Sequence, residues 1–180
     1  MIDHPRLGAT LANKTTIRAA EAGDIPALTE IYNHFVINTH VTFDTEPFSP
    51  LDRQAWFDRY QDNARHQLLV AVDHASGEIL GYTTSGQLRP KKAYDTSVET
   101  TVYLHPENVG QGIGSKLYAA LFDRLANEDV HRCYGIIALP NEASIALHES
   151  FGFTRVASLT EVGRKFDQYW DVIWMEKSLD

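Results

Sequence analysis

The chain has 180 residues, of which 43% are hydrophobic and 22% are charged, and its formal net charge is −8. This length suits one ordinary domain that buries a core without disulfides or metals, and the composition is that of a folded globular protein. The negative charge disfavours a nucleic-acid or anionic-membrane partner, because both need a cationic face. A small anionic ligand is not excluded, because backbone N–H groups at the start of a helix can hold a phosphate.

Targeting signals and cysteines give two further expectations. No apolar stretch approaches the roughly 18 residues that span a bilayer, and the first residues, MIDHPRLGATLANK, lack the apolar core of a secretory signal. We therefore expect a cytoplasmic protein. The single cysteine, Cys133, excludes an intramolecular disulfide and a cysteine-based zinc site. We expect it to be a small core residue, and we predict no metal site.

The N-terminal third predicts a tail, a strand and two helices. Residues 1–14 show no periodicity and are expected to be a poorly ordered tail before a single domain over 15–180. The β-leaning residues 15–18 are followed by apolar residues at helical spacing over 25–36. Ser49, Pro50 and Asp52 form a helix-start signal, so a second helix is predicted through Tyr60.

The rest of the chain alternates strands and helices. A hairpin is predicted over 68–72 and 79–85, a polar loop over 87–95 and a strand over 98–104. Further elements are a helix over 112–128, a strand over 132–139, a helix over 141–150, and strands over 154–162 and 169–177. This order predicts an α/β domain with a mixed, mostly antiparallel sheet. Alternation in the strand over 98–104 places Glu99, Thr101 and Tyr103 on one face.

The most informative segment runs from Val102 to Leu117, where a strand leads through a glycine-rich turn into a helix. Gly110, Gly112 and Gly114 allow backbone conformations closed to other residues and leave room for a phosphate. The N–H groups of the first helical turn lack intrahelical partners and lie at the positive end of the helix dipole. A pyrophosphate could therefore bind there.

Two common phosphate-binding motifs, the nucleoside-triphosphate loop and the dinucleotide fingerprint, do not fit this turn. The nucleoside-triphosphate loop needs Gly-Lys followed by Ser or Thr, whereas here Ser115 precedes Lys116. The dinucleotide fingerprint needs a glycine where Ser115 stands. A glycine-rich turn without any ligand remains an alternative on spacing alone.

Two motifs together resemble the GCN5-related N-acetyltransferase (GNAT) superfamily, over about Thr15 to Leu179. The segment Val109–Gly114 is similar to the family's Arg/Gln-x-x-Gly-x-Gly/Ala loop, and Asn141–Phe153 is similar to its Asn-x-x-(small)-x-x-Leu-Tyr-x-x-x-Gly-Phe motif. The resemblance implies a three-layer fold with helices flanking the sheet, acetyl-CoA as cosubstrate, direct transfer in a ternary complex and a homodimer. It also implies a set of cofactor-binding residues: Val102, Tyr103, Leu104, Val109, Gly110, Gln111, Gly112, Ile113, Gly114, Ser115, Asn141 and His148.

Two positions depart from the wider family pattern. Val109 stands where Arg or Gln is usual, which implies weaker cofactor binding, and His148 stands where Tyr is usual. Within the superfamily the chain looks most like the phosphinothricin and methionine sulfoximine acetyltransferases, in which His is expected at position 148. Segments that carry this closer match are 31–34, 53–57, 98–103, 144–149 and 162–167.

The resemblance also implies catalytic roles, each with a simpler alternative. An amine near neutral pH is mostly ammonium, and Glu99 is the implied general base, the alternative being an exposed or ion-paired strand carboxylate. The backbone N–H of Leu104 is the candidate oxyanion donor. His148 would protonate the thiolate or contact the cofactor, or else only cap or pack. Asn141 would contact the cofactor, act as an N-cap, or do both.

An amino-acid-like acceptor carries a carboxylate, which Arg or Lys binds well. Arg89 and Arg164 are the candidates, with Tyr94, Phe43 and Tyr32 as pocket walls, although each could be a surface or core residue. Lys91, Lys92 and Lys165 are expected on a solvated face. Phosphinothricin or methionine sulfoximine is the expected acceptor; the alternatives are a polyamine, a protein N-terminus, or a non-catalytic acyl-CoA-binding sensor.

Overall fold

The computed structural model describes residues 15–60 and 64–179, so the predicted tail over 1–14 lies outside the described residues. The helices and strands follow the predicted order. They are β1 (Thr15–Ala19), α1 (Ile25–Asn38), α2 (Pro50–Phe57), β2 (Gln67–Asp73), β3 (Ile79–Gln87), β4 (Ser97–Leu104), α3 (Ile113–Leu125), β5 (Arg132–Ala138), α4 (Glu142–Ser150), β6 (Thr154–Lys165) and β7 (Gln168–Ser178). No described helix is long and apolar enough to cross a membrane.

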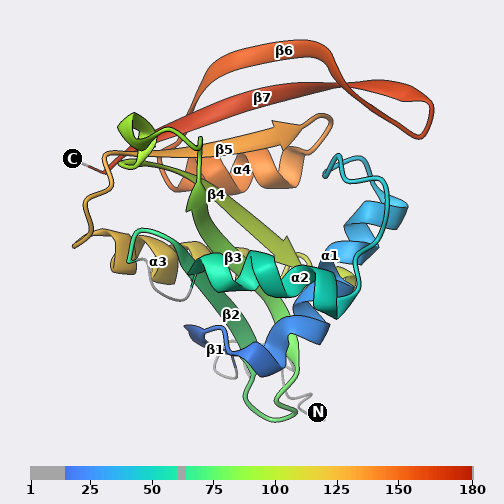
Figure 1. Cartoon of the computed structure of the whole chain (residues 1–180), viewed down its shortest axis with the longest axis vertical. Coiled ribbons are helices and arrows are strands. Elements are labelled where there is room, and N and C mark those ends of the chain that lie inside the picture. Colours follow the sequence, from blue (N-terminus) through green and yellow to red (C-terminus); the bar gives the residue numbers. More distant parts are fainter. Residues whose placement is uncertain (1–14, 61–63, 180) are drawn as a thin grey trace, which may run out of the picture.

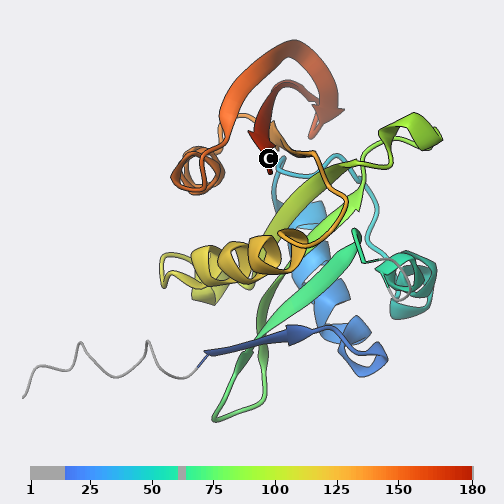
Figure 2. The ribbon, with the colours of Figure 1, turned by 90° about the vertical axis from the view of Figure 1, so that its left-hand side faces the viewer.

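The seven strands form one sheet in the order β1-β2-β3-β4-β5-β7-β6. Neighbouring strands are antiparallel except β4 and β5, which are parallel. Helices α1 and α2 cover one face and α3 covers the other, as Figure 2 shows from the side, and Figure 1 shows α4 beside β5. The mixed, mostly antiparallel sheet between helices confirms the predicted fold class.

The start of α2 forms as its sequence predicts. Ser49 accepts a hydrogen bond from the Asp52 N–H and Asp52 accepts one from the Ser49 N–H, which together make a capping box. The helix ends at Phe57 and continues as a 3₁₀ turn, η2 (Asp58–Tyr60), so the α-helical prediction through Tyr60 was three residues too long. A 3₁₀ turn at a helix end is common, because it satisfies the last free carbonyls.

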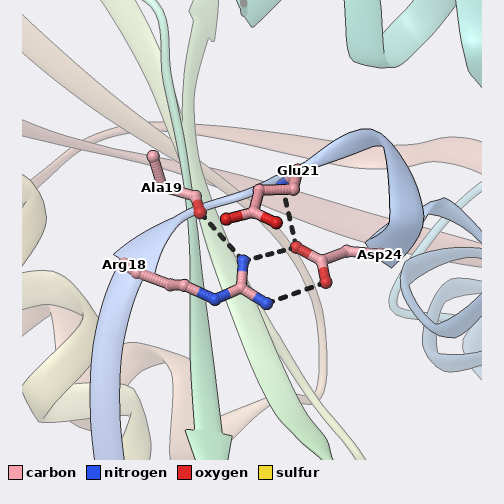
Figure 3. Close-up of polar contacts among 4 residues, drawn as sticks. All are labelled: Arg18, Ala19, Glu21 and Asp24. Carbon is pink, nitrogen blue, oxygen red and sulfur yellow. Dashed lines mark hydrogen bonds and ion pairs between the residues drawn. The ribbon is translucent and has the colours of Figure 1, made fainter.

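A bidentate ion pair joins β1 to the start of α1 (Figure 3). Arg18 Nη1 and Nη2 donate to Asp24 Oδ2 and Oδ1 at 2.7 and 2.9 Å. The same carboxylate accepts the Glu21 N–H at 2.8 Å. Burial opposes ionisation of Asp24, but these hydrogen bonds outweigh it and lower the pKa of the carboxyl below its ordinary value. The pair therefore fixes the turn that leads into α1.

The two faces of β4 have different neighbours. Val98 and Thr100 are buried on the α3 side, where Thr100 Oγ1 lies 3.2 Å from the Tyr118 hydroxyl. Glu99 and Tyr103 point to the opposite face, where Tyr103 packs against Phe35 of α1. This alternation is the one predicted from the sequence.

The sheet opens between β4 and β5. Among the described residues, these strands pair only from Ser97 to Glu99, and Figure 1 shows them diverging beyond that point. On the other side of β4, pairing with β3 continues to Leu104, and the His105 N–H donates to the Leu80 carbonyl. Because antiparallel hydrogen bonds alternate along a strand, the N–H groups of Val102 and Leu104 point away from β3, into the opening.

The tip of the β6–β7 hairpin packs against the segment between α1 and α2. The Phe43 ring lies where a side chain at Gly163 would stand, since a Cβ there would be 2.1 Å from Phe43 Cε2. Lys165 is 4% exposed and its Nζ donates to the Thr42 carbonyl at 2.8 Å, so the predicted solvated position of Lys165 was wrong. The register shift between Leu159 and Gly163 resets the alternation of β6 and turns Lys165 inward.

Candidate active site

A cavity of about 980 Å³ lies on the α1–α2 face, beside the opening between β4 and β5. Its floor comes from β3 and β4, and one wall comes from Ile136 and Ala138 of β5. The opposite wall comes from α2 and the segment between α1 and α2. Of the predicted site residues, Glu99, Tyr103, Tyr32 and Phe43 line this cavity together. Elements distant in sequence therefore enclose one space around Glu99.

Glu99 has the surroundings of a proton acceptor. Its carboxylate makes no hydrogen bond to another described residue, and it lines the cavity at the last position where β4 pairs with β5. Burial raises its pKa above the ordinary value for a glutamate, and the positive charge of Arg89 partly opposes this effect. A carboxylate with a raised pKa and no competing donor accepts protons more readily than a surface glutamate.

Tyr32 and Asp44 form a polar cluster on the opposite wall. The Tyr32 hydroxyl lies 2.5 Å from Asp44 Oδ2 and 2.7 Å from Thr42 Oγ1. Burial and the hydrogen bond to Asp44 raise the pKa of Tyr32 to about 12, so the hydroxyl stays protonated near neutral pH. It donates to Asp44, and this bond holds the α1–α2 segment over the cavity.

Arg53 was not predicted as a site residue, yet its buried guanidinium lines the same cavity. A signal was present in the sequence: Arg53, Trp56, Phe57 and Tyr60 recur at helical spacing, which places the arginine on the apolar face of α2. An arginine on a buried helix face needs a partner, and this indicates a binding site.

The glycine-rich loop has the geometry expected of an anion cradle. Gly110 and Gly112 have φ of +79° and +76°, and both are exposed, with open space where a side chain would start. Gly112 is the N-cap of α3 and no side chain caps this helix start, so the first N–H groups of the helix face outward. Gly114 instead packs against Leu147, which holds α3 close to α4. Val109, Gln111 and Ser115 are exposed around the loop, and Ile113 is buried beneath it.

His148 and Asn141 lie on α4. Asn141 is its N-cap, with Oδ1 accepting from the Ser144 N–H at 3.2 Å. His148 is 3% exposed, with Nδ1 at 2.7 Å from the Ser144 carbonyl and Nε2 at 2.9 Å from the Tyr118 hydroxyl. Burial lowers the pKa of His148 below its ordinary value. Both ring nitrogens are thus engaged inside the protein, on the α3 side of the sheet.

The remaining predicted acceptor residues lie outside the lining of the cavity. Arg89 is close enough to influence Glu99, and its guanidinium lies 5.2 Å from the Trp174 ring. Tyr94 is exposed in the 3₁₀ turn η3 (Lys92–Tyr94). Arg164 is exposed at the hairpin tip, 3.0 Å from Asp167. No cluster of metal-ligating side chains occurs within residues 15–60 and 64–179.

Comparisons with known proteins agree with this geometry. The family model described as "Acetyltransferase (GNAT) domain" matches residues 17–174. A phosphinothricin N-acetyltransferase of Streptomyces coelicolor is 54% identical over 91% of this chain and 95% of its own length. An L-methionine sulfoximine/L-methionine sulfone acetyltransferase of Pseudomonas aeruginosa is 36% identical over 92% of this chain and 95% of its own.

The solved structures show the same fold. An acetyltransferase from Salmonella typhimurium, solved with its cofactor acetyl-CoA, superposes with a TM-score of 0.87 at 36% identity, covering 93% of this chain and 95% of that chain. The resemblance inferred from the two motifs is thereby confirmed. The chain belongs to the GNAT family of acetyltransferases.

Proposed function

We propose that this protein transfers the acetyl group of acetyl-CoA directly to the α-amine of a small amino acid whose side chain ends in a phosphinate, sulfoximine or sulfone group. The observation that carries the proposal is the position of Glu99, which lines the cavity at the point where β4 and β5 separate. The names of the relatives from Streptomyces and Pseudomonas support this acceptor class.

The residues present suit coenzyme A. The diphosphate is assigned to the N–H groups of Gly110, Gly112, Ile113, Gly114 and Ser115, with the loop residues Val109 and Gln111 beside it. Gly110 and Gly112 supply the positive φ that turns these N–H groups outward. Val102, Tyr103 and Leu104 line the path toward the opening, where the N–H groups of Val102 and Leu104 have no neighbouring strand among the described residues. Bound acetyl-CoA supplies the thioester at that opening.

Glu99 is assigned as the general base. It takes the proton of the acceptor ammonium, directly or through a water, and frees the lone pair that attacks the thioester carbonyl. The negative charge that develops on the carbonyl oxygen is stabilised by the Leu104 N–H, which points into the opening. When this charge returns to the carbonyl, the C–S bond breaks, and the departing coenzyme A thiolate takes the second proton of the attacking nitrogen, directly or through a water, to leave the amide and the free thiol. Placing base and donor on one strand fixes their spacing without a moving loop.

His148 is assigned a positioning role rather than thiolate protonation. Its Nδ1 lies beside a carbonyl oxygen and therefore carries the proton, so Nε2 accepts from the Tyr118 hydroxyl. This arrangement leaves no ring proton for a leaving group, while it ties α4 to α3. Asn141 caps α4, and it is also assigned to an amide of the cofactor.

The acceptor is assigned to the cavity, with Tyr32 and Phe43 as walls. Arg89, which is already near Glu99, is placed at the α-carboxylate of the acceptor, next to the reacting amine. Tyr94 and Arg164 are exposed outside the cavity and are assigned no contact with the acceptor.

The test is a free-thiol assay with acetyl-CoA and a panel of amines. Turnover with phosphinothricin, methionine sulfoximine or methionine sulfone supports the proposal, whereas turnover only with a polyamine or a peptide N-terminus rejects this acceptor class. Binding of acetyl-CoA without turnover of any amine would support the alternative of a non-catalytic sensor. A cytoplasmic location is proposed because acetyl-CoA is available there.

A homodimer is proposed from the edge of the sheet. Strand β6 is one of the two edge strands, and the β6–β7 hairpin exposes Val156, Val162, Phe166 and Tyr169 at 51%, 55%, 52% and 60%. An exposed edge with several large apolar side chains is typical of an interface. A second copy of this chain is the proposed occupant, and light scattering of the purified protein tests it: a monomeric mass rejects the dimer.

A further inference from the structure

The guanidinium of Arg53 is buried without hydrogen-bond partners on one edge. Arg53 is 6% exposed, and its Nε and Nη2 have no partner among the described residues. Its Cζ lies 3.6 Å from the centroid of the Trp56 ring and 4.5 Å from that of the Tyr32 ring. The aromatic faces attract the cation, but they leave the donors on this edge unsatisfied.

The two aspartates that line the same cavity each accept a hydrogen bond from another group. Asp44 accepts the Tyr32 hydroxyl at 2.5 Å, and Asp52 accepts the N–H of Ser49 at 2.8 Å in the capping box. A buried cation without an anionic partner is costly to a fold. An external anion that enters the cavity would remove this cost.

The free edge has the geometry of a bidentate donor. Nε–H and one Nη2–H of a guanidinium are parallel, and they match two oxygens of one carboxylate, phosphinate or phosphate group. Since neither atom is hydrogen-bonded to a described residue, both are free to donate to an anion that enters the cavity. Arg53 is therefore poised to bind an oxyanion.

Arg53 lies beside Tyr82, and Arg89 rather than Arg53 is the cation whose charge acts on Glu99. Arg53 is close enough to Tyr82 that its charge opposes the effect of burial on the pKa of that hydroxyl. Tyr82 pairs with Tyr103, four positions along β4 from Glu99, which is about 13 Å of strand. An α-carboxylate lies too near the reacting amine to span much of this distance, whereas an anion at the end of the acceptor side chain reaches further.

We propose that Arg53 binds the oxyanion at the side-chain end of the acceptor, so that the protein selects amino acids with a negatively charged tetrahedral group there. This inference rests on the proposed function, and it adds a residue that decides between acceptors. Arg89 is left to the α-carboxylate and Glu99 to the amine.

The test compares two acceptors of nearly the same shape. Phosphinothricin and methionine sulfone have the same carbon skeleton and the same α-amino acid end, and they differ in a charged phosphinate against a neutral sulfone. We expect Arg53→Met to lower kcat/KM for phosphinothricin by roughly ten- to a hundredfold, mainly through KM, because a charge-assisted pair is lost. For the sulfone and for acetyl-CoA the change should stay within about threefold.

Two further variants and one structure control the experiment. Arg59 is exposed and lines the same cavity, so Arg59→Met removes an equal charge and should not discriminate between the two acceptors. Arg53→Lys keeps the charge without the planar fork, and it should show a smaller selective loss if Arg53→Met does not fold. In a crystal of the wild-type protein with phosphinothricin and coenzyme A, the phosphinate oxygens should lie within hydrogen-bond distance of Nε and Nη2.

The outcomes separate this inference from the proposed function. If the wild-type protein acetylates either acceptor and the Arg53 variants lose both activities equally, the inference is overturned while the acetyltransferase assignment stands. A phosphinate bound away from Arg53 in the crystal has the same consequence. If the wild-type protein acetylates no amino acid, the proposed function fails, and the inference fails with it.

Discussion

Replacing Glu99 by Gln removes the assigned base and little else. The carboxylate makes no hydrogen bond to another described residue, so the similarly sized amide breaks none. Because burial raises the pKa of Glu99, the ionised form costs folding free energy at neutral pH, and the neutral amide should leave the stability equal or slightly higher. A general base contributes about 10²–10⁴-fold in rate, so kcat should fall by about this factor. This fall corresponds to an activation free energy that is higher by about 3–5 kcal/mol.

The assay for Glu99→Gln is free-thiol release with acetyl-CoA and phosphinothricin as a function of pH. In the wild-type protein, activity should fall on the acid side with a midpoint above 4.5, the ordinary value for this carboxyl, because the folded-state pKa is raised. This acid limb should be absent from the variant. Arg89→Met should move the limb to higher pH, since the cation that lowers the pKa of Glu99 is gone. A Glu99→Gln variant with wild-type kcat and an unchanged acid limb would refute the reasoning.

Three further predictions concern the loop, the ion pair and the buried histidine. Gly112→Ala places a methyl group on a residue with φ +76°, which should cost about 1–2 kcal/mol of stability and raise KM for acetyl-CoA. The control is Gly77→Ala, at φ +75° in a remote turn, which should cost the same stability without changing that KM. Asp24→Asn should lower Tm by about 2–8 °C at pH 7, which corresponds to about 1–2 kcal/mol of stability. The difference in Tm from the wild-type protein should disappear as the pH falls through the lowered pKa of Asp24. An equal Tm at pH 7 would argue against a stabilising ion pair. The unfolding free energy should decrease as the pH falls below 6.5, because the unfolded state then binds a proton at His148 that the folded state resists. Thermal unfolding at pH 7.5 and 5.5 should show a smaller decrease in stability for His148→Gln than for the wild-type protein. An identical decrease in both proteins would contradict the assignment of His148.

The order of elements could be predicted because each carries a local signal. The capping box at Ser49, the period of two in β4 and the glycine turn before α3 each act within a few residues. The two family motifs were also local, and the matched family model confirms them. Cys133 is buried and free, as predicted for a small core residue.

The walls of the cavity could not be predicted, because they depend on contacts between distant segments. Lys165 bonds to the Thr42 carbonyl across 123 positions, and Phe43 packs on Gly163. The irregular register of β6 decides which of its side chains face inward, and no local pattern encodes that shift. Arg53 had a helical-spacing signal, but only the fold shows that its partners are aromatic rings and that one edge stays free.

The most direct test of the account is a crystal structure of the protein with coenzyme A. We predict that the diphosphate accepts hydrogen bonds from the backbone N–H groups between Gly110 and Ser115, and that the sulfur lies in the opening between β4 and β5, on the path to Glu99. Coenzyme A bound elsewhere, or a sulfur separated from Glu99 by the body of the sheet, would contradict it.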